Sequence, residues 1–307
     1  MVPSEQFLAY QRQLAASPMP PPPPPRDLRE LRDRIDEAMS GHPLAEGTTA
    51  MEVSAGGVAA FRQEREHGRD DPLVVYFHGG AYRIASALAY RSYCSNLVAR
   101  AGVRVLNVHY RLAPEHPFPA ALDDAISAYE WVLAEGTPAS RVILAGDSAG
   151  GGLTAAVLVA ARERGIPLPA GGVCMSPWVD LTNSGATYRT LADSDSITSH
   201  ASLTEAADLY LQGHDPADPL ASPLFADLSG LPPLLIMASD REVLLDDARR
   251  LAEAATVAGV DTELFVYSGM PHVWMLHYPA FPEAVLAFDQ IGAFAARVTT
   301  REVRSSP

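Results

Sequence analysis

The sequence contains little cysteine and no long apolar segment. Cys94 and Cys174 are the only cysteines among 307 residues, and both lie in apolar stretches. Two buried free thiols are therefore favoured over a disulfide, and a reducing compartment such as the cytoplasm is favoured over an oxidising one. No run approaches the roughly 18 apolar residues that a membrane-spanning helix needs. Residues 1–18 also lack the basic segment followed by an apolar one that marks a signal peptide, which again predicts a cytoplasmic location.

Basic residues are outnumbered by acidic ones. Lysine and arginine together number 23 against 37 aspartates and glutamates, for a formal net charge of −14. Nucleic-acid binding requires clustered basic side chains, so the composition predicts no nucleic-acid partner. The length and the 48% hydrophobic content suit two ordinary domains, or one large α/β domain with an elaboration, and support a full core.

The stretch Arg141–Ala161, RVILAGDSAGGGLTAAVLVAA, organises the rest of the chain. The apolar run Val142–Leu144 predicts a buried parallel strand, and the segment rich in Ala, Leu and Val predicts a helix. In the G-D-S-A-G sequence between them, Gly146 and Gly150 remove side chains that would collide in a sharp strand–helix turn. Such a turn raises Ser148 Oγ above the sheet, which is the geometry of a nucleophile elbow.

Strand and helix patterns alternate along the chain. Residues 51–65 predict a hairpin at a sheet edge. Strands are expected at residues 73–77, 103–108, 172–175, 234–238 and 264–267, with helices at 87–101, 119–135, 244–258 and 282–297. This order predicts an α/β fold with a mostly parallel, doubly wound sheet and a ligand site at the carboxyl ends of its strands.

Two regions depart from this alternation and predict a cap. Residues 178–230 are too long for a loop and contain the helical pattern Leu203–Leu211. At the N-terminus, helices are expected over residues 4–16 and 27–40, on either side of Pro20–Pro25, which predicts a stiff polyproline linker. We therefore divide the chain into N-terminal cap helices (1–45), a first part of the core (46–177), a cap insertion (178–230) and a second part of the core (231–307).

A serine nucleophile needs a histidine base and an acid that orients it. After a nucleophile elbow these residues follow in the order acid, then histidine. His272 lies in the loop YSGMPHVW directly after the last strand, at the edge of the sheet where Ser148 is expected. His200 and His214 fall in the insertion, and His277 is interpreted as a packing or surface residue, so His272 is the predicted base.

Two carboxylates compete for the role of the acid. Asp240 and Glu242 both follow the strand that ends near Ser239, and spacing alone does not choose between them. Asp246 and Asp247 belong to the first turns of the following helix, where the helix dipole favours carboxylates without any catalytic role.

The segment His78-Gly79-Gly80-Ala81 directly follows a core strand and predicts an oxyanion hole. Glycines at this position let backbone N–H groups approach a developing oxyanion without steric interference. We expect donors from Gly79 and Gly80, with a third from Ala149, the residue after the nucleophile.

Four sequences together resemble the hormone-sensitive lipase family of α/β-hydrolases (bacterial family IV): HGGAY, YRLAPEHPFPAALDDA, GDSAGGGL and SPWVDLT. The similarity extends over nearly the whole chain. It implies an α/β-hydrolase fold with a helical cap made of the N-terminus and the insertion, carboxylesterase activity, and no cofactor or metal. The family commonly has Asp-Pro-Leu-x-Asp after this strand, and alignment of that pattern with residues 242–246 implies Glu242 as the acid, with Asp240 as the alternative.

These residues predict a serine carboxylic ester hydrolase that acts on short- to medium-chain acyl esters through an acyl-enzyme intermediate. The predicted catalytic residues are Ser148, Glu242 and His272, and the partner is a small-molecule ester. An amidase, a lactonase or a deacetylase would use the same residues, and a non-catalytic ligand-binding protein is disfavoured because the serine and the histidine are both present. A homodimer is left open. The candidate pocket walls are Tyr82, Phe118, Trp178, Leu203, Tyr210 and Trp274.

Overall fold

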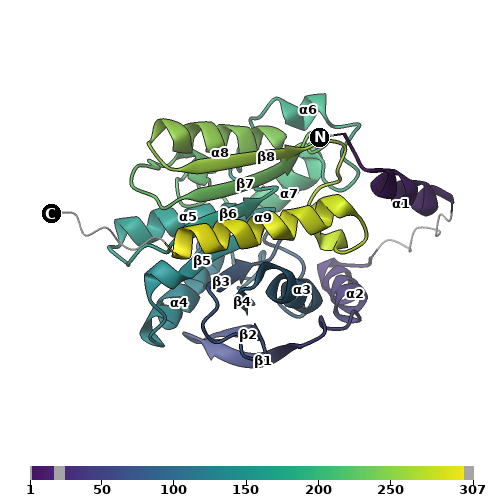
Figure 1. Cartoon of the computed structure of the whole chain (residues 1–307). Coiled ribbons are helices and arrows are strands. Elements are labelled where there is room, and N and C mark those ends of the chain that lie inside the picture. The colour runs from purple at the N-terminus through teal and green to yellow at the C-terminus, as the bar shows by residue number, and fades with distance from the viewer. Residues whose placement is uncertain (1, 17–24, 301–307) are drawn as a thin grey trace.

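The computed structural model describes residues 2–16 and 25–300 and contains an eight-stranded sheet in the order β1-β2-β4-β3-β5-β6-β7-β8 (Figure 1). The strands are β1 (Thr48–Ala55), β2 (Val58–Arg65), β3 (Leu73–Phe77), β4 (Arg104–Val108), β5 (Val142–Asp147), β6 (Gly171–Met175), β7 (Leu234–Ser239) and β8 (Thr262–Tyr267). β1 and β2 form the predicted hairpin and pair antiparallel, whereas β3 to β8 are parallel. The predicted fold class is confirmed.

Helices cover both faces of this sheet. The α-helices of the described residues are α1 (Glu5–Ala16), α2 (Leu28–Ser40), α3 (Arg91–Ala101), α4 (Ala120–Ala134), α5 (Ala149–Glu163), α6 (Thr187–Thr190), α7 (His200–Leu211), α8 (Leu245–Val257) and α9 (Pro282–Thr299). Those that pack on the sheet are α3, α4, α5, α8 and α9. Alternate residues of a strand point to opposite faces, so Val75 and Phe77 of β3 enter the core beneath α4, α5 and α8. Val74 and Tyr76 enter the other core, beneath α3 and α9. Figure 1 shows α9 running across the sheet beside α3.

The N-terminal helices lie against the body of the protein. The ring of Phe7 in α1 packs edge-on against the ring of Phe281, with 4.9 Å between the ring centroids. Phe281 is the residue directly before α9. The predicted helix within the insertion is α7, and the rest of residues 178–230 is mostly turns, with the short α6. The predicted polyproline stretch lies outside the described residues, apart from Pro25, and the four-part division of the chain stays a prediction.

Helix α5 approaches the sheet closely through its glycines. A Cβ atom on Gly150 would lie 2.0 Å from the carbonyl oxygen of Phe77, and one on Gly152 would lie 2.0 Å from that of Trp178. Both neighbours are backbone atoms and cannot rotate away as a side chain can. The first turn of α5 can therefore rest on β3 and on the segment after β6 only because these side chains are absent.

We expect Gly152→Ala to destabilise the protein, because its methyl group forces α5 away from the carbonyl of Trp178. Overpacking of this kind costs about 1–3 kcal/mol of unfolding free energy. The urea midpoint, followed by circular dichroism, should fall accordingly. The control is Gly41→Ala, since Gly41 has φ −67° and its added Cβ would lie 3.6 Å from the nearest atom. Equal midpoints for the two variants would contradict the steric argument.

Candidate active site

Ser148 occupies a strained turn between β5 and α5. Its φ of 54° and ψ of −121° are unfavourable for a residue with a side chain. Two backbone hydrogen bonds hold the turn: Ser148 N donates to the carbonyl of Met175 at 2.8 Å, and Trp178 N donates to the carbonyl of Ser148 at 3.0 Å. The structure therefore has the sharp turn that the sequence predicts, at the carboxyl edge of the central strands.

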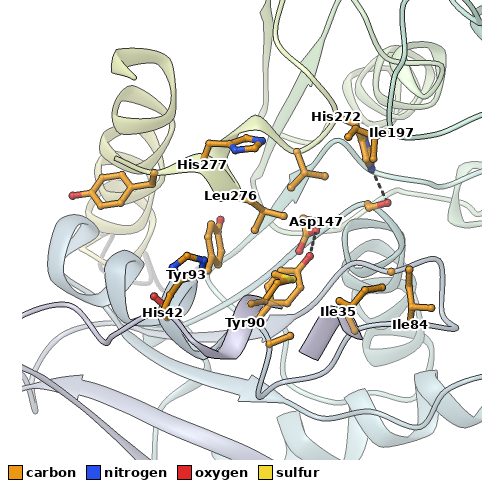
Figure 2. A pocket seen from close by; sticks show the side chains of 18 of the residues that line it. Ile35, His42, Ile84, Tyr90, Tyr93, Asp147, Ile197, His272, Leu276 and His277 are labelled. Carbon is orange, nitrogen blue, oxygen red and sulfur yellow. Dashed lines mark hydrogen bonds between the residues drawn. The ribbon is translucent and has the colours of Figure 1, made fainter. Parts of the chain in front are cut away.

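His272 and Glu242 meet Ser148 from two other segments of the chain. The Nε2 atom of His272 lies 3.0 Å from Ser148 Oγ, and its Nδ1 atom lies 2.9 Å from Glu242 Oε2. Figure 2 shows the dashed hydrogen bond that links His272 to the serine. The glutamate side chain is fully buried and the histidine side chain is 5% exposed. Serine, histidine and glutamate thus form one hydrogen-bonded series shielded from water.

Asp240 points away from this series. Its carboxylate accepts hydrogen bonds from the hydroxyl of Ser268 and the backbone N–H of Gly269, both at 2.7 Å, and so anchors the loop after β8. Of the two acids that the sequence leaves open, the structure brings Glu242 to His272. His277, which the sequence analysis interpreted as a packing or surface residue, lies with its Nδ1 atom 3.2 Å from the hydroxyl of Tyr10.

Ser176, which the sequence analysis missed, holds the glutamate in place. Its hydroxyl donates to Glu242 Oε1 at 2.8 Å, and the N–H of Ser239 donates to the same oxygen at 2.9 Å. Ser176 directly follows β6, as Ser148 follows β5, and it also has a positive φ, of 46°. A polar residue at the carboxyl end of a central strand is the signal that could have identified it.

The pKa of His272 is set by two opposing effects. Burial lowers the pKa of the imidazole, but the hydrogen bond and the negative charge of Glu242 outweigh burial, so the pKa is raised above its ordinary value of 6.5. A raised pKa makes the ring a stronger base when it is neutral. The glutamate therefore both orients the histidine and favours its protonation.

Gly79 is not a free oxyanion donor, in contrast to the prediction. Its N–H donates to Asp147 Oδ1 at 3.0 Å, so this donor is already committed. Within the described part of the chain, the N–H groups of Gly80 and Ala81 have no hydrogen-bond partner, and both residues line the same cavity as Ser148. The N–H of Ala149 is in the first turn of α5, where helical N–H groups lack partners within the helix.

Asp147 joins the two loops that carry these groups. Besides the N–H of Gly79, its carboxylate accepts the hydroxyls of Tyr76 at 2.7 Å and Tyr90 at 2.8 Å, and Figure 2 shows the bond to Tyr90. Burial raises the pKa of Asp147, although these hydrogen bonds oppose that effect. The loop after β3 is thereby tied to the residue directly before the serine.

His78 supports the same loop. Burial lowers its pKa to about 3, so the ring is neutral at physiological pH. Its Nδ1–H donates to the carbonyl of Gly79 at 2.7 Å, and the ring stacks on that of Tyr110 at 4.3 Å. A neutral, stacked ring of this kind holds backbone and takes no part in proton transfer to the serine.

Comparison with known proteins agrees with this geometry. A family described as alpha/beta hydrolase fold matches residues 74–276. A solved structure of an esterase from the bacterial hormone-sensitive lipase family is 42% identical and superposes with a TM-score of 0.88, over 97% of this chain and 100% of the other. The chain belongs to the hormone-sensitive lipase family of α/β-hydrolases.

Curated relatives of this α/β-hydrolase are named after ester and acetyl hydrolysis. An acetyl-hydrolase of Streptomyces hygroscopicus is 44% identical over 269 residues, which cover 87% of this chain and 88% of the relative. An esterase of Acinetobacter venetianus is 36% identical over 224 residues, which cover 73% and 74%.

A cavity of about 920 Å³ opens onto Ser148 and His272 of the hydrolase. Its walls come largely from the N-terminal arm and the loops around α3, with Ile35 and Met39 of α2 among them. Figure 2 shows Ile35 at the cavity. Of the six predicted wall residues only Leu203 lines it. The other five are Tyr82, Phe118, Trp178, Tyr210 and Trp274, and they pack among other aromatic side chains.

The stacking of Tyr82 on Tyr210 explains why the aromatic wall residues were predicted wrongly. The two rings are parallel within 5° at a separation of 4.0 Å, and both are buried. Aromatic pairs contribute about 0.5–1.5 kcal/mol beyond the area that they bury, so these rings are stabilised by packing on one another in the interior. The cavity is lined instead by apolar side chains such as Ile35 and Ile84, and by a different set of aromatic residues that includes Tyr90 and Tyr93 (Figure 2).

Neither a metal cluster nor a membrane span occurs in the described residues. Within residues 2–16 and 25–300, no three His, Cys, Asp or Glu side chains lie close enough together to hold a metal ion. No helix in the same ranges is long and apolar enough to cross a bilayer.

We expect Ser176→Ala to lower kcat by about tenfold or more, because a hydrogen bond to a charged group is worth about 1.5–3 kcal/mol. KM for a p-nitrophenyl ester should change little, since Ser176 does not line the cavity. Steady-state kinetics measure both constants. Ser229→Ala, at an exposed serine, is the matched control. A parental kcat in Ser176→Ala would refute the positioning role.

Proposed function

We propose that Ser148, His272 and Glu242 hydrolyse carboxylic esters through an acyl-enzyme intermediate. As a member of this family of esterases, the chain is a serine ester hydrolase. The observation that carries the assignment of residues is the buried series in which 3.0 Å separates Ser148 Oγ from His272 Nε2 and 2.9 Å separates His272 Nδ1 from Glu242 Oε2. Two further proposals are that the substrate is a short- to medium-chain ester, and that the enzyme works in the cytoplasm, where its two buried free cysteines stay reduced.

In the first half of the reaction, His272 Nε2 accepts the proton of Ser148 while Oγ attacks the ester carbonyl. The resulting imidazolium is stabilised by the carboxylate of Glu242. The tetrahedral oxyanion accepts hydrogen bonds from the free N–H groups of Gly80 and Ala81 and from that of Ala149. His272 then donates the proton to the alcohol oxygen as the carbon–oxygen bond breaks, which releases the alcohol and leaves an acyl-serine.

The second half repeats these steps with water. His272 takes a proton from a water molecule as the water oxygen attacks the acyl carbon, and the same N–H groups hold the new oxyanion. Collapse of this intermediate breaks the bond to Ser148 Oγ, which regains its proton from the imidazolium. One ester and one water thus give one carboxylic acid and one alcohol, and the enzyme returns to its starting state.

The size of the cavity supports a substrate of moderate length. Its volume of about 920 Å³ lies near the upper end of the roughly 300–1,000 Å³ that small-molecule sites occupy. The apolar side chains of Ile35, Ile84 and Ile197 lie around it (Figure 2). Such a site holds more than an acetyl group.

We expect hydrolysis of p-nitrophenyl acetate, butyrate and octanoate, with turnover weakening for the dodecanoate. Ser148→Ala and Glu242→Gln should each lower kcat by about 10⁴-fold or more, because the nucleophile or the orienting charge is lost. Asp240→Asn is the matched control, since its carboxylate holds only the loop at residues 268–269. Loss of turnover in Asp240→Asn but not in Glu242→Gln would reverse the assignment of the acid.

The pH profile provides an independent prediction. Only neutral His272 can accept the serine proton, so kcat/KM falls as the pH drops through the pKa of this histidine in the free enzyme. Because that pKa is raised, the acidic limb should have its midpoint above the ordinary value of about 6.5. In Glu242→Gln the raising charge is gone while burial still lowers the pKa, so the residual activity should have its midpoint at lower pH. An unmoved midpoint would show that another group controls this limb.

A further inference from the structure

Two arginines next to the oxyanion loop differ in how their guanidinium groups are used. All three guanidinium nitrogens of Arg32 in α2 donate hydrogen bonds. The acceptors are the carbonyl oxygens of Arg83 and Ala113, each at 2.7 Å, and both carboxylate oxygens of Glu115, each at 2.8 Å. One of these bonds joins α2 to the loop after β3, through Arg83, and the other three join it to the loop after β4, through Ala113 and Glu115. Arg32 therefore has a structural role that accounts for its whole side chain.

The guanidinium of Arg83 makes no hydrogen bond to any described residue. Its side chain is only 17% exposed, and its Nε atom is buried without a partner. Its one polar contact is an ion pair in which Nη1 lies 3.3 Å from the carboxylate of Glu205. The Glu205 side chain is 67% exposed, and exposed pairs of this kind contribute little free energy. A largely covered guanidinium with a buried, unpartnered Nε is costly. Its unused donors are therefore available to a ligand.

Arg83 lies in the wall of the cavity that contains Ser148. Its backbone N–H donates to the carbonyl of Gly80 at 3.0 Å, which places it one turn beyond the free N–H groups of the oxyanion loop. The opposing wall includes Ser202 and Leu203 of α7, the helix that also carries Glu205. Arg83 thus lines the same cavity as Ser148, and its guanidinium pairs with a carboxylate of the cap helix α7.

Arg91 shows that an unpartnered Nε alone does not make a binding site. Its Nε is buried without a partner as well, but its guanidinium lies over the ring of Phe61 at 6.0 Å, and Arg91 does not line the cavity. Arg83 combines unused donors with a position in the cavity wall.

We propose that Arg83 binds a free carboxylate of the substrate, so that the preferred substrates are esters with a second, ionised carboxyl group. The planar guanidinium presents paired N–H donors that match a carboxylate. The protein carries a net charge of −14, so an anionic ester is not attracted by the overall field and requires a specific cation. Glu205 neutralises Arg83 while the cavity is empty. This proposal rests on the ester hydrolysis proposed above.

The first test compares matched pairs of esters on the parent enzyme. Mono-p-nitrophenyl glutarate is compared with p-nitrophenyl butyrate, which places the carboxylate on the acyl side. 4-Butyryloxybenzoate is compared with its methyl ester, which places the carboxylate on the alcohol side. We expect kcat/KM to favour the anionic member of at least one pair, and the pair that responds shows which part of the substrate faces Arg83. Equal or lower values for both anionic esters would overturn the proposal.

The second test measures how substitutions change the anionic-to-neutral ratio of kcat/KM. Arg83→Gln should lower this ratio by about 10- to 100-fold, the range expected for one hydrogen bond to a charged group. Glu205→Gln should raise it, because the competing carboxylate is removed. The control is Arg164→Gln, at an arginine at the far end of α5, and it should leave the ratio unchanged.

The outcomes separate the two proposals. If Arg83 only ties the loop to the cap through Glu205, both substitutions lower kcat/KM for all four esters by the same factor, and the carboxylate subsite is wrong. If the parent hydrolyses the neutral esters without preference for the anionic ones, the esterase proposal stands and the subsite falls. If the parent hydrolyses none of the four esters, the esterase proposal itself fails.

Discussion

The close approach of α5 to β3 is the constraint on which the rest of the site depends. A side chain on Gly150 would collide with the carbonyl of Phe77, so the chain can turn from strand to helix here only with glycine at this position. The same turn forces Ser148 to a positive φ and projects its hydroxyl at the carboxyl edge of the parallel strands. The backbone bonds to Met175 and from Trp178 offset the strain by tying the turn to β6 and to the segment that follows it.

Two buried carboxylates hold the loops around the serine in place through hydrogen bonds. Asp147 holds the loop after β3 through Gly79, and the cost of its burial is offset by three hydrogen bonds. Glu242 is held in the same way by Ser176 and the N–H of Ser239, and presents its other oxygen to His272. Each loop is thus positioned by a fully paired acid, which is the preorganisation that electrostatic stabilisation of an oxyanion requires.

The N-terminal arm contributes to function through the cavity it encloses. Helix α2 supplies Ile35 and Met39 to the cavity wall, and the bonds of Arg32 fasten it to the oxyanion loop and to the loop after β4. The arm therefore shapes substrate access and steadies the loop next to the reacting carbonyl. Arg83 is in the loop after β3 and lines the cavity, but its guanidinium has only the ion pair with Glu205. This difference between two neighbouring arginines is the basis of the proposed carboxylate subsite.

The sequence by itself determined the fold class, and it predicted the serine and the histidine that the structure brings together. These depend on local patterns: apolar strands, a glycine-flanked serine and a histidine after the last strand. Only the tertiary structure separated Glu242 from Asp240, since both follow β7 within three residues and their directions are set by contacts with Ser176 and with residues 268–269. It also showed that Gly79 is committed to Asp147 and that α2 contributes Ile35 and Met39 to the cavity wall. Such pairings join residues far apart in the chain, and packing decides them, so no local pattern in the sequence encodes them.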